Sequence, residues 1–149
     1  MAAAPLRLLP VLVTVALTLS ACGQTSKDSS GDFKGDEKAV AETVEDLQSA
    51  ASKADGGKIC DELLAADLVA KIKTTAQKTD PKGTCADGLK DALRDADSFE
   101  LQVKKVAING TTAIATVESD DTGDKKSTDS LTLTKAGAGW KISSLGSAS

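Results

Sequence analysis

Reactive side chains are scarce in this chain of 149 residues, which has three cysteines, no histidine and no tyrosine. Without histidine, the sequence excludes a serine–histidine–aspartate triad and a zinc ion bound by histidine. A serine–lysine pair or a pair of carboxylates would still allow nucleophilic or acid–base chemistry, but no motif places such a pair. We therefore expect a protein that is not an enzyme, with no catalytic residues, no metal site and no cofactor. The chemistry that remains belongs to Cys22, Cys60 and Cys85.

Cys22 follows a short apolar segment near the N-terminus. Arg7 is the only charged side chain before it, and the apolar run extends from Leu8 to Leu19. This run is shorter than the roughly twenty residues that a helix needs to cross a bilayer, and its proportions are those of a secretory signal peptide. The order Leu19-Ser20-Ala21-Cys22 resembles the end of a bacterial lipoprotein signal.

This resemblance implies a lipid anchor on Cys22. In bacterial lipoproteins the signal peptide is removed before the cysteine, and the thiol carries a diacylglycerol. Two acyl chains, such as palmitate, hold a protein stably in a membrane where one does not. We accordingly expect cleavage between Ala21 and Cys22 and a location at the cell membrane, facing outside the cytoplasm. The alternatives are an ordinary signal peptide with an incidental cysteine, or an uncleaved anchor.

Cys60 and Cys85 are the cysteines that remain once Cys22 is acylated. In an exported protein an even pair of cysteines indicates a disulfide, which would contribute roughly 3–4 kcal/mol by constraining the unfolded chain. The competing interpretations are two buried free thiols or half of a metal site. A metal site would need further cysteine or histidine ligands at short spacing.

The charges of the chain argue against several kinds of partner. The full chain has 18 Lys and Arg and 22 Asp and Glu side chains, and loss of Arg7 with the signal peptide leaves a net charge of −5. The basic residues form no stripe, so we expect no nucleic-acid partner and no electrostatic attraction to anionic lipid. Asp120, Asp121 and Asp124 lack the alternating ligands of an EF-hand loop, which favours a solvated hairpin loop over a calcium site.

The mature chain divides into a tether and a single domain. Residues 22–35 are polar and rich in Gly and Ser, which predicts a flexible tether between the acylated cysteine and the domain at 36–149. Apolar residues then recur at helical spacing, with a break expected near Ala66-Asp67. The predicted helices are 36–54, 58–78 and 84–96.

From Phe99 onward the apolar residues alternate, as they do in half-buried strands. The Lys104-Lys105 step predicts a bulge, and Asn109-Gly110 predicts a two-residue hairpin turn. Helices followed by an antiparallel meander define an α+β domain.

This order of elements resembles the nuclear-transport-factor-2-like fold of small actinobacterial lipoproteins, over about residues 36–145. The resemblance is carried by the pair of Cys60 and Cys85, the hairpin at 103–113 and the ending Leu131-Thr132-Leu133…Gly139-Trp140-Lys141-Ile142. It implies a cone, in which N-terminal helices pack on a curved antiparallel sheet of about four strands. It also implies a lining of either a pocket or a core, made of Val103, Ala115, Val117, Leu131, Leu133 and Trp140. Another α+β sandwich, with three helices on one sheet, is the alternative.

Two functions fit this protein. We expect a non-catalytic accessory or protein-binding role, with the membrane contacted through the lipid and an envelope protein as partner. The alternative is a carrier or sensor of a small apolar ligand in the cone-shaped pocket. Enzymes that share this fold place polar acid–base residues inside the pocket, and this sequence identifies no such residue.

Overall fold

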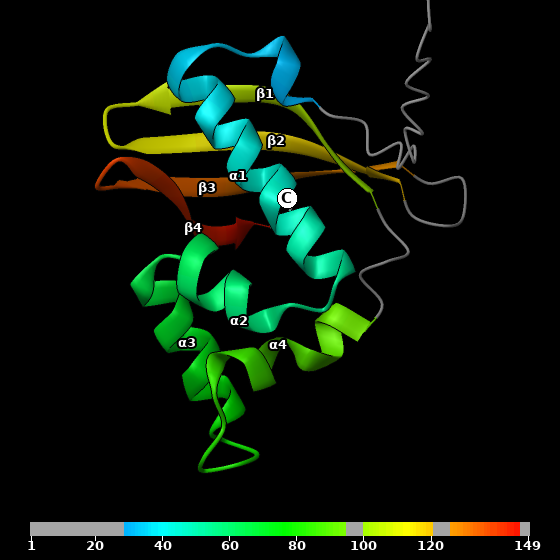
Figure 1. Cartoon of the computed structure of the whole chain (residues 1–149), viewed down its shortest axis with the longest axis vertical. Helices are drawn as coiled ribbons and strands as arrows, with labels where there is room; N and C mark the ends of the chain where they lie inside the picture. The colour runs from blue at the N-terminus through cyan, green and yellow to red at the C-terminus, as the bar shows by residue number, and fades with distance from the viewer. Residues whose placement is uncertain (1–28, 95–99, 121–125, 147–149) are drawn as a thin grey trace, which may run out of the picture.

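The computed structural model of the chain describes residues 29–94, 100–120 and 126–146, which form an α+β domain (Figure 1). The helical elements are η1 (Ser30–Asp32), α1 (Gly35–Ser52), α2 (Gly56–Lys58), η2 (Ile59–Leu63), α3 (Ala66–Ala76) and α4 (Cys85–Arg94). The strands are β1 (Glu100–Asn109), β2 (Thr112–Asp120), β3 (Lys126–Ala136) and β4 (Gly139–Gly146). Ala21, Cys22, Phe99, Asp121 and Asp124 lie outside the described residues.

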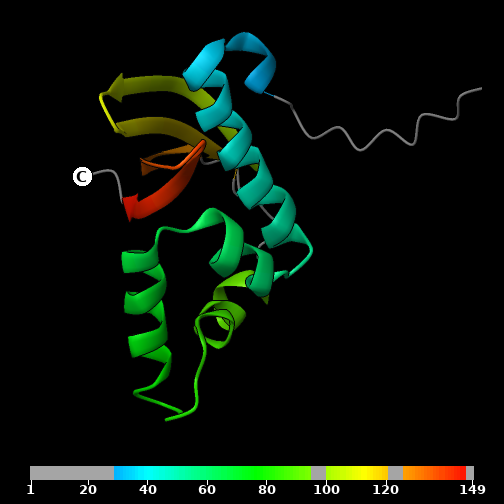
Figure 2. The same ribbon diagram turned by 60° about the vertical axis from the view of Figure 1, so that its left-hand side comes forward.

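The long helix α1 packs across one face of the sheet (Figures 1 and 2). It begins and ends within two residues of the predicted 36–54. Val40, Ala41 and Val44 recur on one side of the helix and are buried, as expected of an amphipathic helix whose apolar stripe faces a core. This packing makes α1 one wall of the domain interior and the sheet the other.

The predicted helix 58–78 is divided into three pieces. α2 passes directly into the π-helical turn η2, and the chain is extended at Leu64 before α3 begins. Leu64 forms a parallel bridge with Ile142, and the Ala65 N–H donates to the Ile142 carbonyl oxygen at 2.8 Å. The helix is interrupted there, just before the predicted position, because these two residues cover part of the free edge of β4.

The four strands pair in chain order, each antiparallel to the next. The register shifts between Val103 and Lys105, so that Lys104 forms a bulge in β1, as predicted. Apolar residues alternate along the strands and face α1. This arrangement confirms the predicted α+β class, with helices followed by an antiparallel sheet.

The first hairpin differs from its prediction by one residue. Asn109 pairs with Thr112, and so the two-residue loop begins at Gly110 instead of Asn109. Gly110 has a φ of 61°, a conformation that glycine adopts without steric cost. Asn109 keeps an ordinary strand conformation, because the residue of the turn that has a positive φ is Gly110.

The smaller helices lie beyond β4, where α3 and α4 pack against each other (Figure 2). Only α1 runs across the sheet itself in the two views (Figures 1 and 2). The buried core of the domain therefore lies mainly between α1 and the inner face of the strands.

Candidate functional site

The side chains predicted to line a pocket or a core lie on the inner face of the sheet. Each of the six is at most 6 % exposed, and they are Val103, Ala115, Val117, Leu131, Leu133 and Trp140. They form one apolar cluster with Val40 and Val44 of α1. The five aliphatic members therefore act as core residues, and their burial holds the sheet against the helix.

Trp140 differs from the other five because it buries a polar atom. Its Nε1 is shielded from solvent and, within the described part of the chain, has no hydrogen-bond partner. A buried donor without a partner costs about 1–3 kcal/mol, and nearly all such groups in proteins are paired with protein, water or ligand. The indole N–H is thus a donor that an acceptor atom placed beside it would satisfy.

Lys135 and Asp36 stand close to this indole. Lys135 pairs with Trp140 across β3 and β4, and its Nζ lies 5.6 Å from the ring centre. The same Nζ lies 2.9 Å from Asp36 Oδ2, at the start of α1. A buried N–H donor, an ammonium group and a carboxylate therefore gather where α1, β3 and β4 meet.

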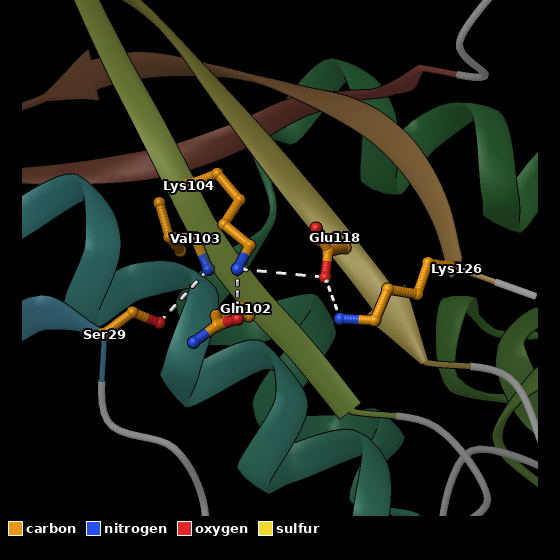
Figure 3. Close-up of polar contacts among 6 residues, drawn as sticks. All are labelled: Ser29, Gln102, Val103, Lys104, Glu118 and Lys126. Atoms are coloured by element: carbon orange, nitrogen blue, oxygen red, sulfur yellow. Dashed lines mark hydrogen bonds and ion pairs between the residues drawn. The ribbon is translucent and has the colours of Figure 1, made fainter. Parts of the chain in front are cut away.

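A second polar group spans the first three strands (Figure 3). Glu118 Oε1 of β2 lies 2.8 Å from Lys126 Nζ and 3.8 Å from Lys104 Nζ, and Lys104 also donates to Gln102 Oε1. These partly exposed ion pairs contribute about 0–1 kcal/mol each. Because Glu118 lies between two ammonium groups, its role is to hold the strands together, and it does not present a free base to a substrate.

A surface hollow of about 310 Å³ lies between the end of α1, α2 and α4. The two carboxylates that line it already accept hydrogen bonds at the beginnings of α2 and α4. Asp55 Oδ1 accepts from the Lys58 N–H at 2.9 Å, while Asp87 Oδ2 accepts from the Thr84 N–H at 2.9 Å and from its hydroxyl at 2.6 Å. The hydrogen bonds from the Thr84 side chain and backbone, helped by nearby Lys90, lower the pKa of Asp87. A carboxyl with a lowered pKa is a poor general base near neutral pH.

Cys60 and Cys85 form the predicted disulfide, with an S–S distance of 2.05 Å and a Cα–Cα distance of 6.2 Å. Both residues are buried. The bond joins η2 to the first residue of α4 and closes a loop that contains α3. This placement is structural, since neither sulfur is exposed to react with a partner.

The predicted lipid attachment at Cys22 and cleavage after Ala21 lie outside the described residues and stay predictions. Over residues 29–94, 100–120 and 126–146, no three His, Cys, Asp or Glu side chains gather closely enough to hold a metal ion. Within those same ranges, no helix combines the length and the apolar character needed to cross a membrane.

The fold and a known family agree on the class of this protein. A helix packed across a four-stranded antiparallel sheet, in this element order, is a nuclear-transport-factor-2-like domain. The model of a family of this fold, described as "Putative lumazine-binding", matches residues 35–145, and the chain belongs to that family. Comparison with curated proteins and with solved structures found no match.

The residues that attach the N-terminal segment to the domain were not predicted from the sequence. Ser29 and Ser30 are buried and hydrogen-bonded to Glu45 of α1, although they fall within the predicted flexible tether. Ser29 and Ser30 therefore pack against the domain, although they come before Asp36 in the chain. Polar composition alone could not reveal this, because the partner carboxylate lies sixteen residues away from Ser29 and follows no local pattern.

Proposed function

We propose that this chain is a membrane-anchored extracytoplasmic domain that binds a small, flat heterocyclic molecule. The observation that carries the proposal is the family match over residues 35–145, because it covers nearly the whole domain and the family description names lumazine binding. The match supports the ligand-binding alternative better than the protein-binding role expected from the sequence. We infer no catalytic role, because no described carboxylate stands as a free base beside Trp140.

Trp140 supplies the chemistry that such a ligand would need. A lumazine ring system is flat, largely apolar on its faces and carries carbonyl oxygens at its edge. Its faces would pack against apolar side chains beside the indole, and a carbonyl oxygen would accept the hydrogen bond that Trp140 Nε1 does not make with any described residue. Ligand pockets in proteins commonly combine apolar walls with a few placed polar groups of this kind.

The pair of Asp36 and Lys135 offers a route to this donor. Both side chains are more than a third exposed, so their ion pair contributes only about 0–1 kcal/mol and opens at little cost. Opening would uncover the Trp140 ring from the side of α1 where the helix begins. The ammonium group of Lys135 would then be free to contact a negatively polarised edge of the ligand.

The membrane anchor is the second part of the proposal. It is supported by the lipoprotein-like order Leu19-Ser20-Ala21-Cys22 and by the buried Cys60–Cys85 disulfide, since disulfides persist in compartments outside the cytoplasm. The expected result for Cys22→Ala is release of the chain from the membrane fraction, or retention of the full-length precursor. Unchanged processing and membrane partition of this variant would refute the anchor.

Ligand binding is tested by unfolding the purified acylated protein in detergent micelles with and without lumazine. A ligand at 100 times its Kd stabilises the native state by about 2.7 kcal/mol, so we expect the unfolding midpoint to rise. The rise should be lost in Trp140→Phe and kept in Ile114→Val, a change on the opposite face of the sheet. A midpoint that lumazine leaves unchanged in the wild-type protein would refute binding of this ring system.

A further inference from the structure

The segment that precedes α1 is fastened to the domain by one carboxylate. The backbone N–H groups of Ser29 and Ser30 both donate to Glu45 Oε1, each at 2.7 Å. The Ser29 hydroxyl oxygen accepts from the Val103 N–H of β1 at 3.1 Å (Figure 3). Hydrogen bonds to a carboxylate are shorter and stronger than those between neutral groups. We call this set of contacts, from Ser29 and Ser30 to Glu45 and Val103, the N-terminal clasp.

The two serines of the N-terminal clasp are buried, and Glu45 is partly buried. Ser29 is 3 % exposed and Ser30 is 5 % exposed. If the segment left this place, Glu45 would lose two donors and the Val103 N–H would lose its acceptor at the edge of the sheet. Unpaired edge groups of this kind are unfavourable, so the contacts favour a docked segment.

The N-terminal clasp also fixes where the chain leaves the domain. Ser29 lies between the middle of α1, at Glu45, and the bulged part of β1, at Val103. It comes before residue 35, where the family match begins. The exit point therefore lies at the corner that η1, α1 and β1 form together (Figures 1 and 3).

We propose that this corner is the face of the domain that lies against the lipid bilayer, held there by the N-terminal clasp. The proposal rests on the proposed acylation of Cys22. Whatever conformation the chain adopts between Cys22 and Ser29, seven residues reach at most about 25 Å. The corner around Ser29 is therefore confined close to the bilayer surface, and the opposite end of the domain, with α3 and α4, points away from it.

Opening the N-terminal clasp would change this geometry. The next fixed point of the chain is the start of α1 at Gly35, and thirteen residues from Cys22 to Gly35 reach up to about 45 Å. Glu45 thus limits the distance between the domain and the membrane. While its carboxylate holds Ser29, the segment that can extend from Cys22 ends at Ser29 and is six residues shorter than the segment that ends at Gly35.

The experiment uses the full acylated chain in phosphatidylcholine vesicles that contain a dansyl-labelled lipid. Trp140 is the only tryptophan of the chain and serves as the energy donor. We expect clear energy transfer in the wild-type protein and loss of most of it in Glu45→Ala. Glu42→Ala changes an exposed carboxylate of the same helix and should keep the wild-type value. Glu45→Gln keeps an oxygen acceptor and should fall between the two.

Amide hydrogen exchange tests whether the N-terminal clasp forms, independently of where the membrane lies. The Ser29 and Ser30 amides should be protected in the wild-type protein and should lose protection in Glu45→Ala, while amides of β2 and β3 stay protected and report a folded domain. If Glu45→Ala fails to fold, Ser29→Ala and Glu45→Gln take its place, with a partial loss expected in each.

The possible failures are distinguishable. An acylated wild-type chain whose Ser29 and Ser30 amides exchange freely overturns the N-terminal clasp and the membrane-facing corner that depends on it, and it leaves the anchor of the proposed function intact. Protected amides together with energy transfer that Glu45→Ala leaves unchanged overturn the membrane-facing corner. A chain that carries no lipid on Cys22 overturns both that corner and the anchor of the proposed function.

Discussion

The ammonium group of Lys135 lies 5.6 Å from the centre of the Trp140 ring, and the two residues face each other directly across β3 and β4. The arrangement places a cation over the face of the one aromatic ring that belongs to the buried core. Such a contact contributes about 0.5–1 kcal/mol at an exposed site. Nε1 of the same indole is buried and, among the described residues, has no hydrogen-bond partner.

The unpaired indole N–H predicts an unusual tolerance of Trp140→Phe. The smaller ring loses buried area and leaves a small void, but it also removes the donor that costs about 1–3 kcal/mol when unpaired. We expect the two effects to offset, so that the free energy of unfolding in the absence of ligand changes by no more than about 1 kcal/mol. Urea unfolding followed by far-ultraviolet circular dichroism measures this change.

Trp140→Ala is the matched comparison for this position. It removes the whole ring and should lower the free energy of unfolding by about 3–5 kcal/mol, as large-to-small changes in a core do. If Trp140→Phe destabilised the protein as much as Trp140→Ala, the indole N–H would have a partner and the site at Trp140 would be refuted.

Loss of the disulfide should destabilise the domain without changing its fold. Cys60 and Cys85 are separated by 25 residues, and closing a loop of that length removes unfolded-chain entropy worth about 3–4 kcal/mol. The double variant Cys60→Ala and Cys85→Ala, unfolded in urea beside the oxidised wild type, measures the difference. Equal midpoints would show that the bond adds nothing to stability. Reduction of the wild-type protein should add the mass of two hydrogens.

Much of the fold could be predicted because its signals are local. The alternation of Ala113, Ala115 and Val117 indicated a strand with one buried face, and these residues are buried as expected. The double lysine at 104–105 indicated the bulge that the register shift confirms. The pairing of the cysteines was predicted because only two remain after Cys22 in a chain that we expected to be exported.

The unpredicted features depend on partners far away in the sequence. Glu45 lies on the polar side of α1, where a carboxylate normally meets solvent, and only the folded structure brings Ser29 to it. A break in this helical stretch was predicted near Ala66-Asp67, but its position at Leu64 depends on the distant edge of β4. That Trp140 Nε1 has no hydrogen-bond partner among the described residues could not be predicted from the sequence, because it depends on how the surrounding side chains pack.

Gly88 is a position where helix propensity and packing disagree. In α4 an alanine would ordinarily be favoured over glycine by about 1 kcal/mol. However, a Cβ at Gly88 would lie 2.8 Å from Ile72 Cγ2 and 3.0 Å from the Ile72 carbonyl oxygen, so α3 would have to move. We expect Gly88→Ala to lower the free energy of unfolding by about 1–3 kcal/mol in urea titration, as overpacking does.

Gly57→Ala provides the control for Gly88. A Cβ at Gly57 meets only Asp55 Oδ1, at 3.6 Å, which is an ordinary contact. This change should leave stability unaltered or raise it by about 0.4–1 kcal/mol. A stabilising Gly88→Ala would show that α3 and α4 are not closely packed at this point.

The acid sensitivity of α4 should depend on Thr84. Hydrogen bonds from the Thr84 side chain and backbone lower the pKa of Asp87 in the folded protein, with a further contribution from Lys90. A carboxyl whose pKa is lower in the folded state than in the unfolded state stabilises the fold above the unfolded pKa, and this contribution is lost as the pH falls through the folded pKa. Thr84→Val removes the hydroxyl donor and should raise the pKa of Asp87 toward its ordinary value, as followed by carboxyl carbon NMR.

Thr75→Val is the control, because it removes a hydroxyl that donates to the Lys71 carbonyl oxygen of α3, and it should leave the Asp87 titration unchanged. Equal Asp87 titration curves in Thr84→Val and the wild-type protein would contradict the role of Thr84.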